Sequence, residues 1–194
     1  MKKIGLTGVM GAGKSSVIQI LKDAGITVLD CDVINAQLQT VGEQGYLALV
    51  HAFSEDILDA EKQLDKKKMS DLIFSNPKRK LEAEAILHPL IKARVDDEIK
   101  QHENELLVVV EVPLLFEVKW ETFFDEIWVV ASDEQILLSR LQQFRQVSEQ
   151  EAKRRLQHQM SQEEKIQKAN VVLWNNDDLT HLKEQIYAIL NTEK

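Results

Sequence analysis

One short segment near the start of the chain constrains its fold more than any other. Residues Gly8-Val9-Met10-Gly11-Ala12-Gly13-Lys14-Ser15 match the pattern G-x-x-x-x-G-K-[ST] at every fixed position. The segment directly follows an apolar run that predicts a strand, Ile4–Thr7, and directly precedes a run of helical period, Ser15–Ala24. Both flanks favour a phosphate-binding loop over a glycine-rich turn that merely connects a strand to a helix.

The residue types in this loop suit the binding of a nucleoside triphosphate. Glycines let the backbone curl so that successive N–H groups point at phosphate oxygens, and the helix that follows adds its positive N-terminal dipole. We expect Lys14 to reach the β- and γ-phosphates and the Ser15 hydroxyl to hold Mg²⁺. The expected cofactors are therefore ATP and Mg²⁺. The residues predicted to bind them are Gly8, Gly11, Ala12, Gly13, Lys14, Ser15 and Ser16.

The rest of the chain predicts an α/β fold around a five-stranded parallel sheet. Short apolar runs without polar alternation are typical of parallel strands covered on both faces. These runs are Ile4–Thr7, Ile26–Leu29, Leu106–Val110, Ile127–Val130 and Val171–Trp174. Segments of helical period lie between and after them, at Ser15–Ala24, Val33–Gln39, Tyr46–Phe53, Lys66–Phe74, Lys78–Leu87, Ile91–His102, Asp133–Gln143, Glu149–Met160, Gln162–Ala169 and Leu179–Leu190. His88-Pro89 falls at an expected break between two of these helices.

This order of elements predicts a single domain over residues 1–194. A nucleotide core is expected at about 1–32, 105–132 and 170–194. The helical stretch of about 33–104 has no predicted strand of its own, so we expect a lobe on the substrate side. The helices of about 138–168 lie between the last two strands and are predicted to form a lid.

The composition excludes several classes of function. A formal net charge of −8 argues against wide contact with nucleic acid. The longest apolar stretch, Leu106 to Phe116, is interrupted by Glu111 and Pro113 and is too short to span a bilayer. No partner membrane or nucleic acid is expected, and a cytoplasmic location is the default. The lone Cys31 is interpreted as a small buried side chain, and the histidines show no spacing typical of zinc ligands.

Two acids follow the second predicted strand, at the carboxyl edge where ligands of open α/β folds bind. A kinase needs a carboxylate that orients the acceptor hydroxyl and takes its proton, and Asp32 suits that role. Asp30 is a candidate neighbour of Mg²⁺. The alternative is that these residues begin a helix, since aspartate is a favoured N-cap.

Basic residues in the predicted lid allow two interpretations. The arginines there could neutralise charge on the transferring phosphoryl group, or they could belong to a solvated amphipathic helix pair. They are Arg140, Arg145, Arg154 and Arg155. His88 is likewise either a ligand contact or a side chain that hydrogen-bonds at a helix end.

Taken together, these motifs resemble the bacterial dephospho-coenzyme A kinase family from Ile4 to about Leu190. The specific pieces are the D-x-D after the second strand, Leu87-His88-Pro89-Leu90-Ile91 and Val112-Pro113-Leu114-Leu115-Phe116-Glu117. Later matches are Ser148-Glu149 through Arg155-Leu156, Gln159, Lys165 and Asn175.

The resemblance implies a three-layer P-loop kinase with a helical acceptor lobe and a lid. Its implied reaction transfers phosphate from ATP to the ribose 3′-hydroxyl of dephospho-coenzyme A, the last step of coenzyme A synthesis. Asp32 matches the family's proposed base, and Arg140 matches a lid arginine. The implied catalytic residues are Asp32, Lys14 and Arg140. The implied acceptor-binding residues are Asp32, His88, Pro113, Leu114, Glu117 and Arg145.

The chain departs from the family pattern at four positions. Phe144 and Ala36 stand where the family commonly has arginine, Lys66 replaces another arginine, and Asn170 replaces an aspartate. If Arg145 takes over from position 144, the side chain must rotate by about 100° around the helix. Alternatives are another small P-loop nucleoside or nucleotide kinase, a GTPase-like switch and a non-catalytic binding protein. The segment Trp174–Asp177 lacks the lysine of a guanine-reading motif, which argues against the switch.

Overall fold

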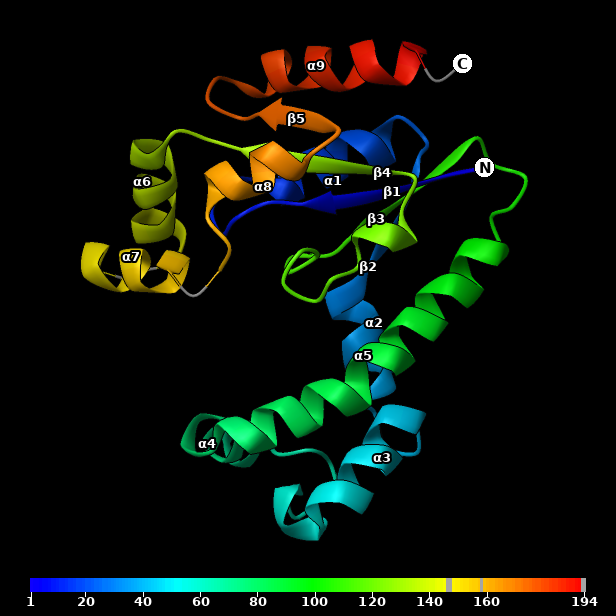
Figure 1. Ribbon diagram of the computed structural model, residues 1–194, viewed down its shortest axis with the longest axis vertical. Coiled ribbons are helices and arrows are strands. Elements are labelled where there is room, and N and C mark those ends of the chain that lie inside the picture. Colours follow the sequence, from blue (N-terminus) through cyan, green and yellow to red (C-terminus); the bar gives the residue numbers. More distant parts are fainter. Residues whose placement is uncertain (146–147, 158, 193–194) are drawn as a thin grey trace. The chain divides into compact units, whose positions relative to one another are not determined.

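The computed structural model describes residues 1–145, 148–157 and 159–192. The chain folds into two compact units. The first contains Met1–Leu29 and His102–Lys194, and the second contains Asp30–Gln101. Figure 1 shows the helices and strands of both. Among the described residues, no helix is both long enough and apolar enough to cross a membrane.

The first unit is built on the predicted five-stranded sheet, with strand order β2-β3-β1-β4-β5. The pairings of β1 with β3 and β4, and of β4 with β5, are parallel. The strands are β1 (Lys2–Thr7), β2 (Thr27–Asp30), β3 (Leu107–Glu111), β4 (Glu126–Ala131) and β5 (Val171–Trp174). In this order β1 lies at the centre, so the loop that follows it is placed between the carboxyl ends of β3 and β4.

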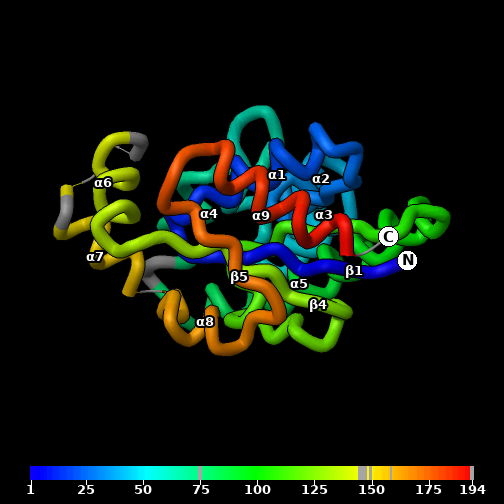
Figure 2. The backbone as a smooth tube through the Cα atoms, turned by 90° about the horizontal axis from the view of Figure 1, so that it is seen from above, coloured from blue at the N-terminus to red at the C-terminus, as the bar shows by residue number. Residues whose placement is uncertain are grey.

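The helices of the first unit are α1 (Lys14–Asp23), α6 (Glu134–Arg145), α7 (Glu149–Gln157), α8 (Gln162–Lys168) and α9 (Leu179–Thr192). Of these, α1 and α9 cover one face of the sheet. Alternate strand residues such as Ile4, Leu6 and Trp128 are buried in one cluster with apolar residues of α1 and α9. Helices α6 and α7 contact each other and lie at one end of the unit (Figure 2).

The opposite face is covered by the chain between β3 and β4. Leu115 and Phe124 pack directly on Gly5 of β1, where a Cβ atom would lie 2.6 Å from Leu115 Cδ1 and 2.7 Å from Phe124 Cδ2. A short 3₁₀ turn, Glu121–Phe123, leads this segment back to β4. Glycine is therefore required at position 5 by close packing.

The second unit is helical. It contains α2 (Cys31–Leu38), α3 (Gln44–Phe53), α4 (Lys66–Ser75), α5 (Pro77–Lys100) and a 3₁₀ turn at Glu55–Ile57. Helix α5 packs against α2, α3 and α4. The core of the second unit is formed by Tyr46, Leu49, Phe53, Ile57, Leu58 and Ala83. This unit buries its own apolar residues, as a compact body must.

The predicted helix break at His88-Pro89 is wrong, because α5 continues through Pro89. Proline removes one backbone hydrogen bond and disfavours the helical conformation of the residue before it, so local sequence favours a break. Buried residues on both sides of the proline, Ala83 before it and Ile91, Val95 and Ile99 after it, share the packed side of the helix. This packing outweighs the local preference.

Replacing Gly5 with alanine should destabilise the first unit. The added Cβ would overlap two side chains of a packed interior, so we expect a loss of about 1–3 kcal/mol in the free energy of unfolding. Urea denaturation followed by tryptophan fluorescence would measure it. An unchanged unfolding midpoint would contradict this account and mean that Leu115 and Phe124 move aside without cost.

Candidate active site

The loop between β1 and α1 has the backbone that a phosphate cradle needs. Gly13 is the N-cap of α1 with a φ of 92°, and no side chain caps the helix. A Cβ atom on Gly13 would overlap the amide nitrogen of Asn175. Both the left-handed conformation and the close contact require glycine. The uncapped N-terminus of α1 suits an anionic ligand.

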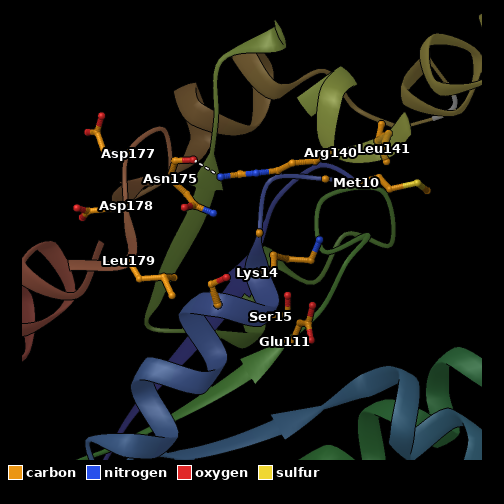
Figure 3. Close-up of a pocket in the computed structure, with 13 residues that line it drawn as sticks. Met10, Lys14, Ser15, Glu111, Arg140, Leu141, Asn175, Asp177, Asp178 and Leu179 are labelled. Carbon is orange, nitrogen blue, oxygen red and sulfur yellow. Dashed lines mark hydrogen bonds between the residues drawn. The ribbon is translucent and has the colours of Figure 1, made fainter. Parts of the chain in front are cut away.

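Lys14 is turned toward its own loop (Figure 3). Its Nζ donates a hydrogen bond of 2.9 Å to the carbonyl of Gly8 and lies 3.5 Å from that of Val9. These contacts hold a positive charge at the mouth of the cradle. A bound phosphate would offer the same ammonium group a charged acceptor, which makes a stronger hydrogen bond than a neutral carbonyl does.

A network of hydrogen bonds centred on Arg140 also holds the loop. Arg140 of α6 donates to the carbonyls of Asn175 at 3.0 Å and Ala12 at 3.4 Å, and to Ser132 Oγ at 3.0 Å. Asn175, which is 4% exposed, donates its own amide to Ala12 O at 2.9 Å. Figure 3 shows Arg140 reaching across to Asn175. The guanidinium is thus part of the wall of the cradle.

These groups surround a cavity of about 600 Å³. The cavity collects most of the predicted nucleotide-binding residues, namely Gly11, Gly13, Lys14, Ser15 and Ser16, together with Arg140. It is also lined by Met10, Glu111, Leu141, Asn175, Asp177, Asp178 and Leu179 (Figure 3). Its volume lies within the range of ordinary small-molecule sites.

Glu111 was not predicted as a site residue. It ends β3, and its register partner on β1 is Leu6, two residues before the loop begins. The sequence contained a signal for this residue. Glu111 is an acid at the end of an apolar run, Leu107–Glu111, and the strand formed by that run pairs with β1. Ser132 and Asn175, which directly follow β4 and β5, were not predicted as site residues either.

The segment after β3 lies against the end of β1. Thr7 Oγ donates to the carbonyl of Pro113 at 3.1 Å, which joins the predicted acceptor segment to the strand that carries the loop. Leu115 and Phe116 are buried, whereas Leu114 is 41% exposed. Of the three predicted acceptor-binding residues here, Leu114 therefore offers the most open surface.

Glu117 is held by a buried lysine. The Nζ of Lys165, a residue with no exposed surface, lies 2.8 Å and 2.9 Å from the two carboxylate oxygens. Glu117 also accepts the N–H of Met160 at 2.9 Å. A buried ion pair of this kind is costly to break because one charge is left without a partner. The structure gives Glu117 a structural contact, and its role in acceptor binding stays a prediction.

The predicted acids after β2 belong to the second unit. Asp30 is the N-cap of α2, and its Oδ1 accepts the N–H groups of Asp32 at 2.8 Å and Val33 at 3.1 Å. Asp32 and Ala36 are both exposed, one turn apart on α2. The capping interpretation of Asp30 is confirmed. The Asp30 carboxylate holds the backbone N–H of Asp32 in place. His88, half-buried within α5, and Lys66, exposed at the start of α4, belong to the same unit.

The arginines of α7 are paired with an acid on their own helix. Arg154 Nε and Arg155 Nε lie 2.9 Å and 2.8 Å from the Glu151 carboxylate. The hydrogen bonds from Arg154 and Arg155 lower the pKa of Glu151 to about 2. This pairing favours the solvated-helix interpretation for these two arginines. The side chains of Phe144 and Arg145 lie outside the described part of the structure.

Asn170 keeps the hydrogen bond that an aspartate would make. Its Oδ1 accepts the N–H of Ile127 at 2.8 Å, and its own N–H donates to the carbonyl of Ile127 at 2.9 Å. These bonds join the start of β5 to β4. An aspartate carboxylate has the same acceptor, so this departure from the family pattern leaves the contact in place.

The donor atoms at the cavity suit Mg²⁺. Mg²⁺ prefers oxygen ligands and is usually bound through one or two carboxylates together with substrate phosphates and waters. Ser15 and Glu111 both line the cavity and supply a hydroxyl and a carboxylate. Within residues 1–145, 148–157 and 159–192, no group of three or more His, Cys, Asp or Glu side chains is placed to hold a metal ion.

Comparison with known proteins identifies the family. The model of the dephospho-CoA kinase family matches residues 2–181. This chain belongs to the dephospho-CoA kinase family. A dephospho-CoA kinase of Streptococcus agalactiae serotype III is 39% identical over 192 residues, which cover 97% of each chain. One from Carboxydothermus hydrogenoformans is 35% identical and covers 98% of this chain and 94% of its own.

Solved structures agree with the family assignment. A Thermus thermophilus protein has a TM-score of 0.85 at 32% identity, over 98% of this chain and 97% of its own. The dephospho-CoA kinase from Campylobacter jejuni has a TM-score of 0.73 at 25% identity, over 97% of this chain and 95% of its own. An Acinetobacter baumannii shikimate kinase, at 16% identity and a TM-score of 0.55 over 100% of this chain and 95% of its own, shares the fold alone. The predicted family and P-loop kinase fold are confirmed.

Replacing Lys165 with methionine should destabilise the first unit. The change leaves the part-exposed Glu117 carboxylate without its buried partner, so we expect a loss of about 1–3 kcal/mol. Lys168→Met is the matched control, because Lys168 forms an exposed pair with Glu121 at 3.6 Å and should cost less than about 1 kcal/mol. Chemical denaturation of both variants measures the difference, and equal losses would contradict a special contribution from the buried pair.

Proposed function

We propose that this chain transfers the γ-phosphoryl group of ATP to the ribose 3′-hydroxyl of dephospho-coenzyme A, giving coenzyme A and ADP. The observation that carries the proposal is the match of residues 2–181 to the dephospho-CoA kinase family on a chain whose phosphate cradle is intact. The reaction is the final step of coenzyme A synthesis. We place it in the cytoplasm, where ATP is available to metabolic kinases.

On the nucleotide side, the loop binds the phosphates and the cavity beside it holds the rest of ATP. Backbone N–H groups of the loop and of the N-terminus of α1 donate hydrogen bonds to the phosphate oxygens, and Lys14 moves from the Gly8 carbonyl to the β- and γ-phosphates. Arg140, already fixed at the loop, adds positive charge beside the transferring group. Ser15 and Glu111 are the residues that would hold Mg²⁺. Bound there, Mg²⁺ would neutralise negative charge that develops on the phosphates during transfer.

On the acceptor side, Asp32 orients the 3′-hydroxyl and takes its proton. This role is supported by its exposure at the first turn of α2 and by the Asp30 cap that fixes the local backbone. The remaining acceptor contacts are assigned to His88, Pro113, Leu114, Glu117 and Arg145. Asp30 stays a candidate neighbour of Mg²⁺ through the carboxylate that also caps the helix. Ala36 and Lys66, which replace arginines common in the family, should weaken the hold on the acceptor's phosphates.

The assay that tests the function measures ADP release with Mg²⁺-ATP and dephospho-coenzyme A, and mass spectrometry identifies the product. Adenosine and AMP serve as parallel acceptors, and EDTA replaces Mg²⁺ in one arm. We expect coenzyme A only with dephospho-coenzyme A, and only with Mg²⁺ present. Turnover with adenosine or AMP instead would favour another small P-loop kinase. No turnover with any acceptor would reject kinase activity for this chain.

Separate variants test the roles of Asp32 and Lys14. Asp32→Asn should leave ATP affinity within about twofold of the wild type and lower kcat by about 10²-fold or more, because only the proton acceptor is removed. Lys14→Ala should instead weaken ATP binding, because a charged phosphate contact is lost. Calorimetric titration with ATP and steady-state kinetics separate the two effects. Near-normal turnover of Asp32→Asn would end its assignment as the base.

A further inference from the structure

One peptide group in the first half of the phosphate-binding loop is held from both sides. The N–H of Met10 donates to Gln159 Oε1 at 3.1 Å. The carbonyl of Val9, in the same peptide group, accepts the N–H of Ala12 at 3.2 Å and lies 3.5 Å from Lys14 Nζ. Gln159 is 149 positions away from Met10 along the chain and is not among the residues assigned above to ATP, Mg²⁺ or the acceptor.

Binding of a nucleotide changes the forces on this peptide group. When Lys14 moves to the phosphates, the Val9 carbonyl loses the nearby ammonium group and keeps the hydrogen bond from the Ala12 N–H. Glycines flank the segment at positions 8 and 11, and a backbone of this kind rotates at low cost. The bond from Gln159 then still holds the N–H side of this peptide group and so keeps its orientation.

We propose that Gln159 is a positioning residue for phosphoryl transfer, which fixes the Val9–Met10 peptide group and thereby the shape of the phosphate cradle. Met10 itself lines the nucleotide cavity, so a rotation of its peptide group alters the wall against which ATP lies (Figure 3). Displacements of about 1 Å in a phosphoryl-transfer site are enough to slow the reaction by about 10²-fold.

Gln159 can act in this way because the stretch that follows it is firmly anchored. Met160 donates its N–H to Glu117 at 2.9 Å, next to the buried pair of Glu117 with Lys165. Ser161 begins α8 with a complete capping box, in which the side chains of Ser161 and Glu164 each accept a backbone N–H of the other residue.

A further anchor joins this stretch to the end of β4. The side chain of Gln162 makes two hydrogen bonds to the backbone of Ser132, donating to its carbonyl at 2.8 Å and accepting its N–H at 3.0 Å. Ser132 Oγ in turn receives a hydrogen bond from Arg140. Groups held by such packing and hydrogen bonds keep their partners within the narrow geometric limits that catalysis requires. The same stretch connects α7 of the predicted lid to the sheet.

The inference rests on the proposed kinase activity, so the experiment includes readouts that do not need an acceptor. Gln159→Met keeps the length of the side chain and replaces the amide oxygen with a much weaker acceptor. We expect faster deuterium exchange at the Met10 amide, a rise in the Kd for ATP and a fall of about tenfold in kcat/KM for ATP. The thermal unfolding midpoint should change little, because one hydrogen bond is removed from a part-buried site.

Two further variants serve as controls. Gln159→Glu keeps an oxygen acceptor, so slow exchange at the Met10 amide should be retained. Gln167→Met makes the same chemical change at an exposed position of α8 and should leave exchange, ATP affinity and kinetics unchanged.

The proposal is overturned if Gln159→Met keeps the exchange rate of the Met10 amide and kcat/KM for ATP within about twofold of the wild type. It is also overturned if ATP affinity and kcat/KM fall only to the extent that a lower unfolding midpoint explains. A wild-type protein that makes no coenzyme A would reject the proposed function alone. In that case ATP affinity and Met10 exchange would still decide the role of Gln159.

Discussion

The nucleotide site depends on the hydrogen bonds that meet at the carbonyl oxygen of Ala12. Asn175 Nδ2 lies 2.9 Å from this oxygen, and Ser132 Oγ and Arg140 lie 3.3 Å and 3.4 Å from it. The three side chains come from the ends of β4 and β5 and from α6. A curled loop needs its outward-facing carbonyls satisfied before its N–H groups can face a ligand. This network meets that need and brings a permanent positive charge to the loop.

The chain between β3 and β4 covers one face of the sheet and also contains residues predicted to bind the acceptor. Its buried side chains cover one face of the sheet at Gly5, and Pro113 is bonded to Thr7 at the end of β1. Within the same chain, Glu117 forms an ion pair with Lys165 of α8. The loop that binds phosphate and the segment assigned to the acceptor are therefore supported by one continuous set of contacts.

In the second unit, helix α2 has one side that is buried in the fold and one side that is exposed. Helix α2 buries Cys31, Ile34 and Leu38 against its neighbours, while Asp32 and Ala36 remain exposed. Substitution on the exposed side costs little stability, so alanine at position 36 is compatible with the fold.

The strand, loop and helix around Gly8–Ser15 could be predicted from the sequence, and so could the five strands, because these elements are encoded by residues close together in the chain. The same local signals misled at Pro89, where burial on both sides of the proline keeps α5 continuous. The residues that shape the loop depend on strand order. Arg140, Asn175 and Gln159 lie more than 100 positions from the loop and reach it because β1 is central in β2-β3-β1-β4-β5. Local sequence thus predicted a phosphate-binding loop and its position, whereas tertiary packing decided which distant side chains hold that loop, since only the folded sheet brings them together.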